Sequence, residues 1–255
     1  MSWCVLGENV IGTSHRRDKS PCQDAFRLTS FGPSEEFLVV AVADGAGSAA
    51  HAERGANIAC EELVRQVKSS APMSLFSKDR VGELFTSARN ALLLEAQAMG
   101  VPARQLACTA LLAIVGTESS AFAQIGDGAI VAGVGDELRV LFWPAPSEYV
   151  NTTDFLTDET YLTAIQCGVV SERLTDLAIL TDGLQRLALD FQTQTPYRAF
   201  FAPMFRQLRS GLPIESLRGH FHSFLDSVAV NARTDDDKTL VIASRRDSHE
   251  IANTD

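Results

Sequence analysis

The chain has 255 residues and a formal net charge of −10, with 45% apolar and 21% charged residues. These values are typical of a folded globular protein, and the length suits one large domain or two small ones. The acidic balance argues against a nucleic-acid partner, because clustered lysines and arginines hold phosphate backbones.

The chain carries five cysteines without a Cys-x-x-Cys pair, which favours free thiols in a reducing compartment over disulfides or a zinc site. We find no secretion signal and no apolar run as long as a membrane span. The sequence therefore predicts a cytoplasmic protein without a membrane partner.

The N-terminal part predicts strands around a polar segment. Residues 2–12 indicate a strand, a Gly-Glu-Asn turn and a second strand. A basic loop from Thr13 then ends in the acid Asp24. The apolar, β-branched run 37–43 predicts a buried strand that ends in Asp44-Gly45. Taken alone, Asp-Gly between apolar runs favours a hairpin turn, because it is the strongest short hairpin signal.

Two amphipathic helices are expected next, over residues 50–69 and about 81–99, because apolar residues recur there every three or four positions. The apolar stripe of the first is rich in alanine, which lets a helix pack closely on a sheet. Gly100 and Pro102 end the second helix.

The middle of the chain predicts a run of short strands. Four strands joined by short turns indicate an antiparallel meander. They cover residues 107–115, 120–125, 129–134 and 138–143. Residues 144–168 lose this periodicity, and so long an irregular loop is often a lid or binding loop. Residues 177–181 predict a further buried strand.

The last part predicts two helices with aromatic stripes, which start near Tyr197 and Ile214, and a strand at 239–244. We assign the aromatic residues to the core. Runs of strands separated by pairs of helices indicate an α+β protein with sheets packed together and helices outside. One domain over residues 1–245 and a polar tail at 246–255 are expected.

Five aspartates stand beside apolar strands, and packed sheets can bring such strand ends to one rim. They are Asp24, Asp44, Asp127, Asp182 and Asp237. Clustered carboxylates repel one another unless a cation neutralises them, and oxygen ligands without His or Cys suit Mg²⁺ or Mn²⁺. Two such ions about 3.5–4 Å apart can activate a shared water for phosphoester hydrolysis.

A calcium loop at Asp235-Asp236-Asp237 is a weaker alternative, because its spacing is not that of an EF-hand and no Glu ends it.

Six short motifs in order carry a resemblance to a known family. They are Gln23-Asp24-Ala25, Asp44-Gly45-Ala46-Gly47, Ala107-Cys108-Thr109-Ala110, Gly126-Asp127-Gly128, Thr181-Asp182-Gly183 and Asp237-Lys238-Thr239, the last matched to a family pattern Asp-Asn-x-Thr. Together they resemble the protein phosphatase type 2C family of metal-dependent serine/threonine phosphatases, in its bacterial single-domain form.

The resemblance implies a four-layer α-β-β-α sandwich of two antiparallel sheets with a two-metal centre at one end. Asp44 would bridge two Mg²⁺ or Mn²⁺ ions and the Gly45 carbonyl would join one of them. Asp182 and Asp237 would hold the other ion, Asp127 a third, and Asp24 would orient water. Residues 144–170 would form a variable flap.

Three departures concern substrate binding. Lys19 stands where the family has a phosphate-binding arginine, and a lysine can still hold a phosphate, as a point charge without the bidentate geometry. Arg16, Arg17 or His15 could reach the phosphate instead. Ala46 stands where some members have a histidine acid, and Lys238 is read in place of the usual Asn.

The expected function is hydrolysis of phosphoserine and phosphothreonine by a monomer, with a phosphoprotein substrate and a cognate kinase as partner. The alternative is a regulatory module of the same fold that binds phosphoproteins and turns over weakly.

Overall fold

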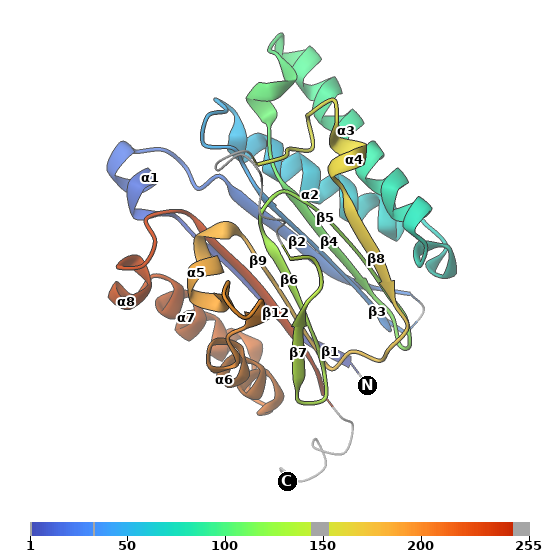
Figure 1. Ribbon diagram of the computed structural model, residues 1–255, viewed down its shortest axis with the longest axis vertical. Coiled ribbons are helices and arrows are strands. Elements are labelled where there is room, and N and C mark those ends of the chain that lie inside the picture. Colours follow the sequence, from blue (N-terminus) through green and yellow to red (C-terminus); the bar gives the residue numbers. More distant parts are fainter. Residues whose placement is uncertain (1, 33, 144–152, 247–255) are drawn as a thin grey trace.

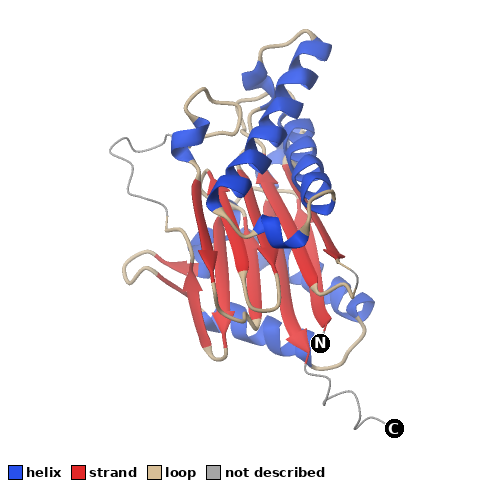
Figure 2. Cartoon of the chain, turned by 90° about the vertical axis from the view of Figure 1, so that its right-hand side faces the viewer, coloured by secondary structure: helices blue, strands red, loops and turns tan. Residues whose placement is uncertain are grey.

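The computed structural model describes residues 2–32, 34–143 and 153–246. Two five-stranded antiparallel sheets lie face to face, and helices cover both outer faces (Figure 1). Figure 2 shows the strands in the middle of the molecule with helices on either side. The expected α-β-β-α sandwich is confirmed.

The first sheet joins the two ends of the described chain. Its order is β1 (Ser2–Val10), β12 (Lys238–Arg246), β9 (Asp176–Leu180), β6 (Ala129–Val134) and β7 (Glu137–Val140). Helices α6 (Arg198–Arg209) and α7 (Ile214–Leu225) cover its outer face. Their aromatic stripes pack there, with Phe201, Phe205 and Phe221 buried against the sheet.

The second sheet is built mostly from the first half of the chain. Its order is β2 (Asp24–Phe31), β3 (Phe37–Asp44), β4 (Ala110–Val115), β5 (Ser120–Ile125) and β8 (Gln166–Val170). Helices α2 (Ala52–Lys68) and α3 (Lys78–Met99) cover it. The alanine stripe of α2 is buried, as its pattern predicts. Helix α3 begins earlier than the apolar pattern indicates, because the Ser77 side chain accepts a hydrogen bond from the Arg80 amide.

The apolar layer between the two sheets includes Val40, Phe122 and Ile179. Short elements connect the rest: α1 (Thr13–Asp18), α4 (Tyr161–Ala164), α5 (Gln185–Ala188), α8 (Val228–Asn231), the 3-10 helices η1 (Pro72–Leu75), η2 (Ala103–Leu106) and η3 (Asp182–Leu184), and the paired strands β10 (Leu189–Asp190) and β11 (Thr195–Pro196). None of the described helices is long and apolar enough to cross a membrane.

The expected turn near Gly7 is wrong, since β1 runs through it as one strand. Gly7 lies opposite Val241 of β12. A Cβ atom there would lie 2.6 Å from the ring of Phe26, so the glycine makes room for an aromatic side chain of the facing sheet. A packing requirement, rather than a turn, explains this glycine.

The expected meander is also wrong, because the chain changes sheets at Gly126–Gly128. Strands β4 and β5 belong to the second sheet, whereas β6 and β7 belong to the first. Gly126 has φ +96°, which favours glycine. The Gln124 side-chain amide donates to the carbonyls of Gly126 and Gly128 at 3.2 and 2.8 Å. The crossing therefore holds Asp127 at one end of both sheets.

Two expected boundaries change. Residues 166–170, at the end of the expected flap, form strand β8, which pairs with β5. Residues 144–152 of the expected flap lie outside the described part. The first residue of the expected tail, Arg246, ends β12, and its Nε donates to the Leu208 carbonyl at 2.9 Å. Residues 247–255 lie outside the described part.

Candidate metal centre

Asp44 is fixed by the strands on both sides of it. The β2–β3 register pairs Asp24 with Asp44. The Asp44 amide donates to Thr109 Oγ1 at 2.9 Å, and the Thr109 amide donates to the Asp44 carbonyl at 2.8 Å. This end of the sheets lies beside α1, α5 and α8 (Figure 1). The carboxylate thus projects from a rigid strand end and not from a free hairpin.

Two glycines let neighbouring backbones approach this strand end. A Cβ on Gly45 would lie 2.6 Å from backbone atoms of Ala52, and one on Gly183 would lie 2.0 Å from the Asp237 carbonyl oxygen. Larger residues would push the strand end and η3 away from these neighbours. The Asp-Gly pairs of the sequence therefore serve close packing around the acids.

A cavity of about 160 Å³ collects side chains from distant parts of the chain. Its walls include four acids, Asp44, Asp127, Asp182 and Asp236, which come from β3, the crossing turn, η3 and the segment before β12. The other described residues that line it are His15, Gln23, Gly45, Ala46, Gly47, Thr109, Thr153 and Phe155. The Thr153 hydroxyl donates to Asp127 Oδ2 at 2.9 Å.

Asp237, an expected metal ligand, is not among the described residues that line this cavity. Its Oδ1 accepts the Gly12 amide at 2.6 Å, and its Oδ2 accepts the Gln23 amide at 2.6 Å and lies 2.9 Å from His15 Nδ1. Both carboxylate oxygens are therefore engaged in holding the loop. The neighbouring acid, Asp236, lines the cavity instead.

The signal for Asp236 was present in the sequence. The pattern Asp-Asn-x-Thr contains one residue between Asn and Thr, so counting back from Thr239 gives Asp236 in the first position and Asp237 in the Asn position. Lys238 then occupies the variable position and does not replace the Asn. Its buried ammonium donates to Asn231 Oδ1 at 2.9 Å.

Asp24 lies behind the cavity and is not among its lining residues. Its Oδ2 accepts the hydroxyls of Thr181 and Thr239 at 2.8 Å each, while its buried Oδ1 has no hydrogen-bond partner among the described residues. Burial raises the pKa of Asp24 to about 8, and the charges of Asp237 and Asp182 add to this effect. The carboxyl is therefore buried beside the acids of the cavity, and one of its oxygens has no partner in the described structure.

The electrostatics of the acids favour a bound cation. Burial first, then neighbouring carboxylates, raises the pKa of Asp44 well above its usual range and that of Asp182 to about 6. The pKa of Asp236 is raised mainly by burial. Asp182 Oδ1 is buried without a hydrogen-bond partner in the described structure. A cation would relieve this repulsion and satisfy the orphaned oxygen.

The donor set fits Mg²⁺ or Mn²⁺, because it consists of oxygen atoms. Within residues 2–32, 34–143 and 153–246, no three His, Cys, Asp or Glu side chains are grouped as a complete metal site. Mg²⁺ commonly keeps several water ligands and takes only one or two carboxylates. The cavity therefore fits ions that water hydrates in part, and not a fully protein-bound ion.

The three cations expected to bind phosphate do not line this cavity. Arg16 forms an ion pair with Asp226 at 2.8 Å, and Arg17 forms one with Asp18 at 3.3 Å. Lys19 is exposed at the end of α1, with φ 58°. The structure therefore does not bring these side chains to the four aspartates that line the cavity.

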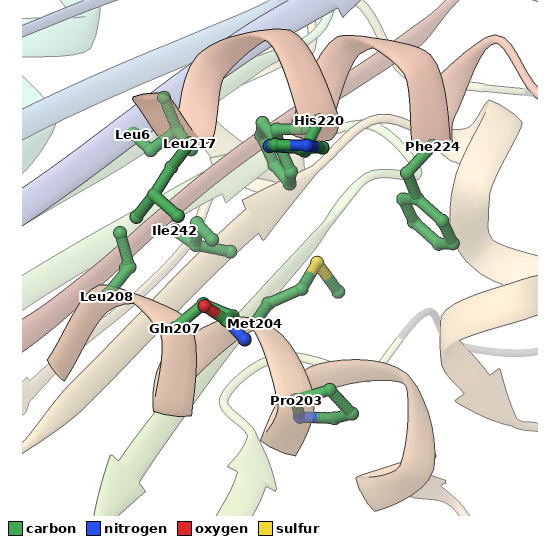
Figure 3. Close-up of a pocket in the computed structure, with 10 residues that line it drawn as sticks. Leu6, Pro203, Met204, Gln207, Leu208, Leu217, His220, Phe224 and Ile242 are labelled. Atoms are coloured by element: carbon green, nitrogen blue, oxygen red, sulfur yellow. The ribbon is translucent and has the colours of Figure 1, made fainter. Parts of the chain in front are cut away.

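An apolar pocket of about 170 Å³ lies on the outer face between α6 and α7 (Figure 3). Met204 and Gln207 of α6 and Leu217 and Phe224 of α7 point toward it, with Ile242 of the sheet behind them. No described acid lines this pocket, so its walls offer no carboxylate to a hard cation. The acid-lined cavity is the better candidate for chemistry.

A family model described as Protein phosphatase 2C matches residues 11–220. "Serine/threonine-protein phosphatase 3" of Escherichia coli K12 is 34% identical over 249 residues, which cover 95% of this chain and 98% of that relative. The chain belongs to the protein phosphatase 2C family. It is therefore an enzyme of the phosphoprotein phosphatase class.

Solved structures related to this protein phosphatase 2C chain have the same fold. The serine/threonine phosphatase Stp1 of Staphylococcus aureus has a TM-score of 0.62 and 16% identity, and 95% of each chain is covered. The catalytic domain of the phosphatase PstP, solved with two manganese ions, has a TM-score of 0.64 and 14% identity, with 96% of this chain and 99% of that one covered.

Proposed function

We propose that this protein phosphatase hydrolyses phosphoserine and phosphothreonine in proteins with the help of two Mg²⁺ or Mn²⁺ ions. The observation that carries the proposal is that four aspartates from separate segments line one cavity. The two manganese ions of PstP, a phosphatase of the same fold, support it.

In this proposal Asp44, Asp182, Asp236 and the Gly45 carbonyl hold the two ions, and Asp127 holds a third. Ions bound there supply a low-pKa water and polarise a phosphoryl oxygen. Asp44 keeps its position because β2 and β4 flank it. Asp24 lies behind the cavity, and its oxygen that has no partner among the described residues would orient water bound at the metal centre.

The test is hydrolysis of phosphoserine and phosphothreonine peptides with Mn²⁺ and with EDTA. We expect turnover only with metal, and its loss in Asp44→Asn. Asp136→Asn is the matched control, because its side chain is exposed at the surface and pairs only with Arg198 among the described residues. Phosphopeptide binding without metal-dependent turnover would favour the regulatory module instead.

We also propose that the protein acts in the cytoplasm as a monomer, on a phosphoprotein whose kinase is its functional partner. The free state of all five cysteines supports a reducing compartment. Size-exclusion chromatography tests the monomer, and a substrate phosphorylated by the kinase tests the pairing.

A further inference from the structure

The cavity acids face a histidine rather than an arginine or lysine. Of the described side chains that line the cavity, His15 alone can carry a positive charge. Its side chain is 18% exposed, so it is neither buried in the core nor free at the surface. A phosphate approaching the aspartates would therefore meet this imidazole.

The ring of His15 is oriented by Asp237. Nδ1 lies 2.9 Å from Asp237 Oδ2, and Nε2 has no hydrogen-bond partner among the described residues. A carboxylate beside Nδ1 fixes that nitrogen as the donor and sets the orientation of the ring. Nε2 is then available to an anion in the cavity.

Helix α1 is fixed to the segment that carries Asp236 and Asp237. The Ser14 amide and hydroxyl donate to the Asp235 carbonyl at 3.0 and 2.6 Å. A Cβ on Gly12 would lie 2.5 Å from that same carbonyl oxygen, so the two segments are in close contact. His15 therefore has a fixed position relative to the acids.

We propose that His15, oriented by Asp237, binds the phosphoryl group of the substrate and takes the place of the side chains of Arg16, Arg17 and Lys19. The imidazolium donates from Nε2 to a phosphoryl oxygen and from Nδ1 to Asp237. Asp237 is a positioning residue, because it touches the histidine and not the phosphate. This inference rests on the proposed phosphatase function.

Two substitutions of His15 distinguish the roles of its two ring nitrogens. The amide of Asn reaches the Nδ1 position, so His15→Asn keeps a donor to Asp237 and loses the group that faces the cavity. The longer Gln places an amide near Nε2, so His15→Gln keeps a neutral donor toward the phosphate. If the role of His15 is purely structural, His15→Asn should retain more of the phosphate affinity than His15→Gln. If His15 binds phosphate, His15→Gln should retain more.

The matched control is His222 of α7, whose Nδ1 also lies 2.9 Å from a carboxylate, that of Glu8, on a different face of the fold. We expect His15→Asn to raise the KM for a phosphopeptide and the inhibition constant of inorganic phosphate about tenfold, the effect of losing one charge-assisted hydrogen bond. His15→Gln should recover part of this loss, and His222→Gln should match the wild type. Asp237→Asn should raise KM more than it lowers kcat.

Calorimetry with inorganic phosphate in the presence of Mn²⁺ measures the contribution of His15 to phosphate affinity without requiring turnover. If the wild type does not hydrolyse phosphopeptides, the proposed function fails, and the calorimetric comparison of His15→Asn with His222→Gln still decides this inference. Equal phosphate affinity in those two variants overturns it. So does a loss of affinity in Lys19→Ala that His15→Asn does not share. Thermal melts show that each variant is folded.

Discussion

At the scale of single residues, two adjacent aspartates serve different purposes. Asp236 faces the cavity, whereas the carboxylate of Asp237 is occupied by two backbone amides and His15. Residue type alone does not distinguish them. The difference comes from the segment packed against them, where the amides of Gly12 and Gln23 donate to the Asp237 carboxylate.

Substitutions in the run Asp235-Asp236-Asp237 test which of these acids binds metal. We expect Asp236→Asn to weaken Mn²⁺ binding by at least about tenfold, because it removes a charged oxygen ligand. Asp235→Asn is the control, since the Asp235 side chain is exposed. Calorimetric titration with Mn²⁺ measures both. Equal Mn²⁺ affinity in these two variants would contradict the assignment of Asp236.

Gly183 tests the close packing beneath the acids. An alanine Cβ would lie 2.0 Å from the Asp237 carbonyl oxygen, so Gly183→Ala should lower the free energy of unfolding by about 2 kcal/mol. Gly219→Ala is the control, because nothing lies within 4 Å of a Cβ there and alanine favours a helix. Urea denaturation gives both values, and an unchanged free energy in Gly183→Ala would refute the steric argument.

At the scale of elements, hydrophobic periodicity predicts the main strands and helices but not which sheet a strand joins. The turn Gly126-Asp127-Gly128 is equally compatible with a hairpin and with a crossing. Only the facing layers decide, because β6 buries Ile130 against the second sheet and Val131 against α6 and α7. The turn expected near Gly7 is wrong for the same reason, since the neighbour that requires this glycine, Phe26, belongs to the other sheet.

The candidate site was predictable in part. Asp44, Asp127 and Asp182 follow strands that the sequence identifies, and the structure brings them together. The relation of His15 to Asp237 spans more than 200 residues, so no local pattern reveals it. A contact of that kind depends on how α1 packs on the segment before β12.

The start of α3 offers a test at this scale. Ser77 accepts a hydrogen bond from the Arg80 amide, one of the helix's otherwise unpaired donors. Ser77→Ala should therefore lower the free energy of unfolding by about 1 kcal/mol. Ser87→Ala, inside the same helix, should be neutral, because its hydroxyl only bonds back to the Glu83 carbonyl. Equal values for the two variants in urea denaturation would argue against the cap.

At the scale of the whole molecule, the buried acids couple folding to pH and metal. Burial raises the pKa of Asp24 to about 8 and that of Asp182 to about 6, from an ordinary value of 3.8 for an aspartate. Between about pH 4 and 8 the metal-free folded protein thus holds more protons than the unfolded chain. Its free energy of unfolding must fall as the pH rises through this range.

The melting temperature in EDTA should therefore be lower at pH 8 than at pH 5.5. The rise in melting temperature on adding Mn²⁺ should be larger at pH 8 than at pH 5.5. Asp24→Asn removes one of these carboxyls and should flatten the dependence in EDTA. Differential scanning calorimetry provides the measurement. A melting temperature that rises with pH in EDTA would contradict the argument.

The pairing of β1 with β12 has a consequence for the order in which the protein can mature during synthesis. Most of the second sheet, with α2 and α3, comes from the first half of the chain and is synthesised before the strands that complete the first sheet. Strand β1 must wait for the last strand, and Asp44 must wait for Asp182 and Asp236. A nascent chain on the ribosome thus carries an unfinished cavity, and the proposed metal centre can be complete only after the segment that leads into the final strand has emerged.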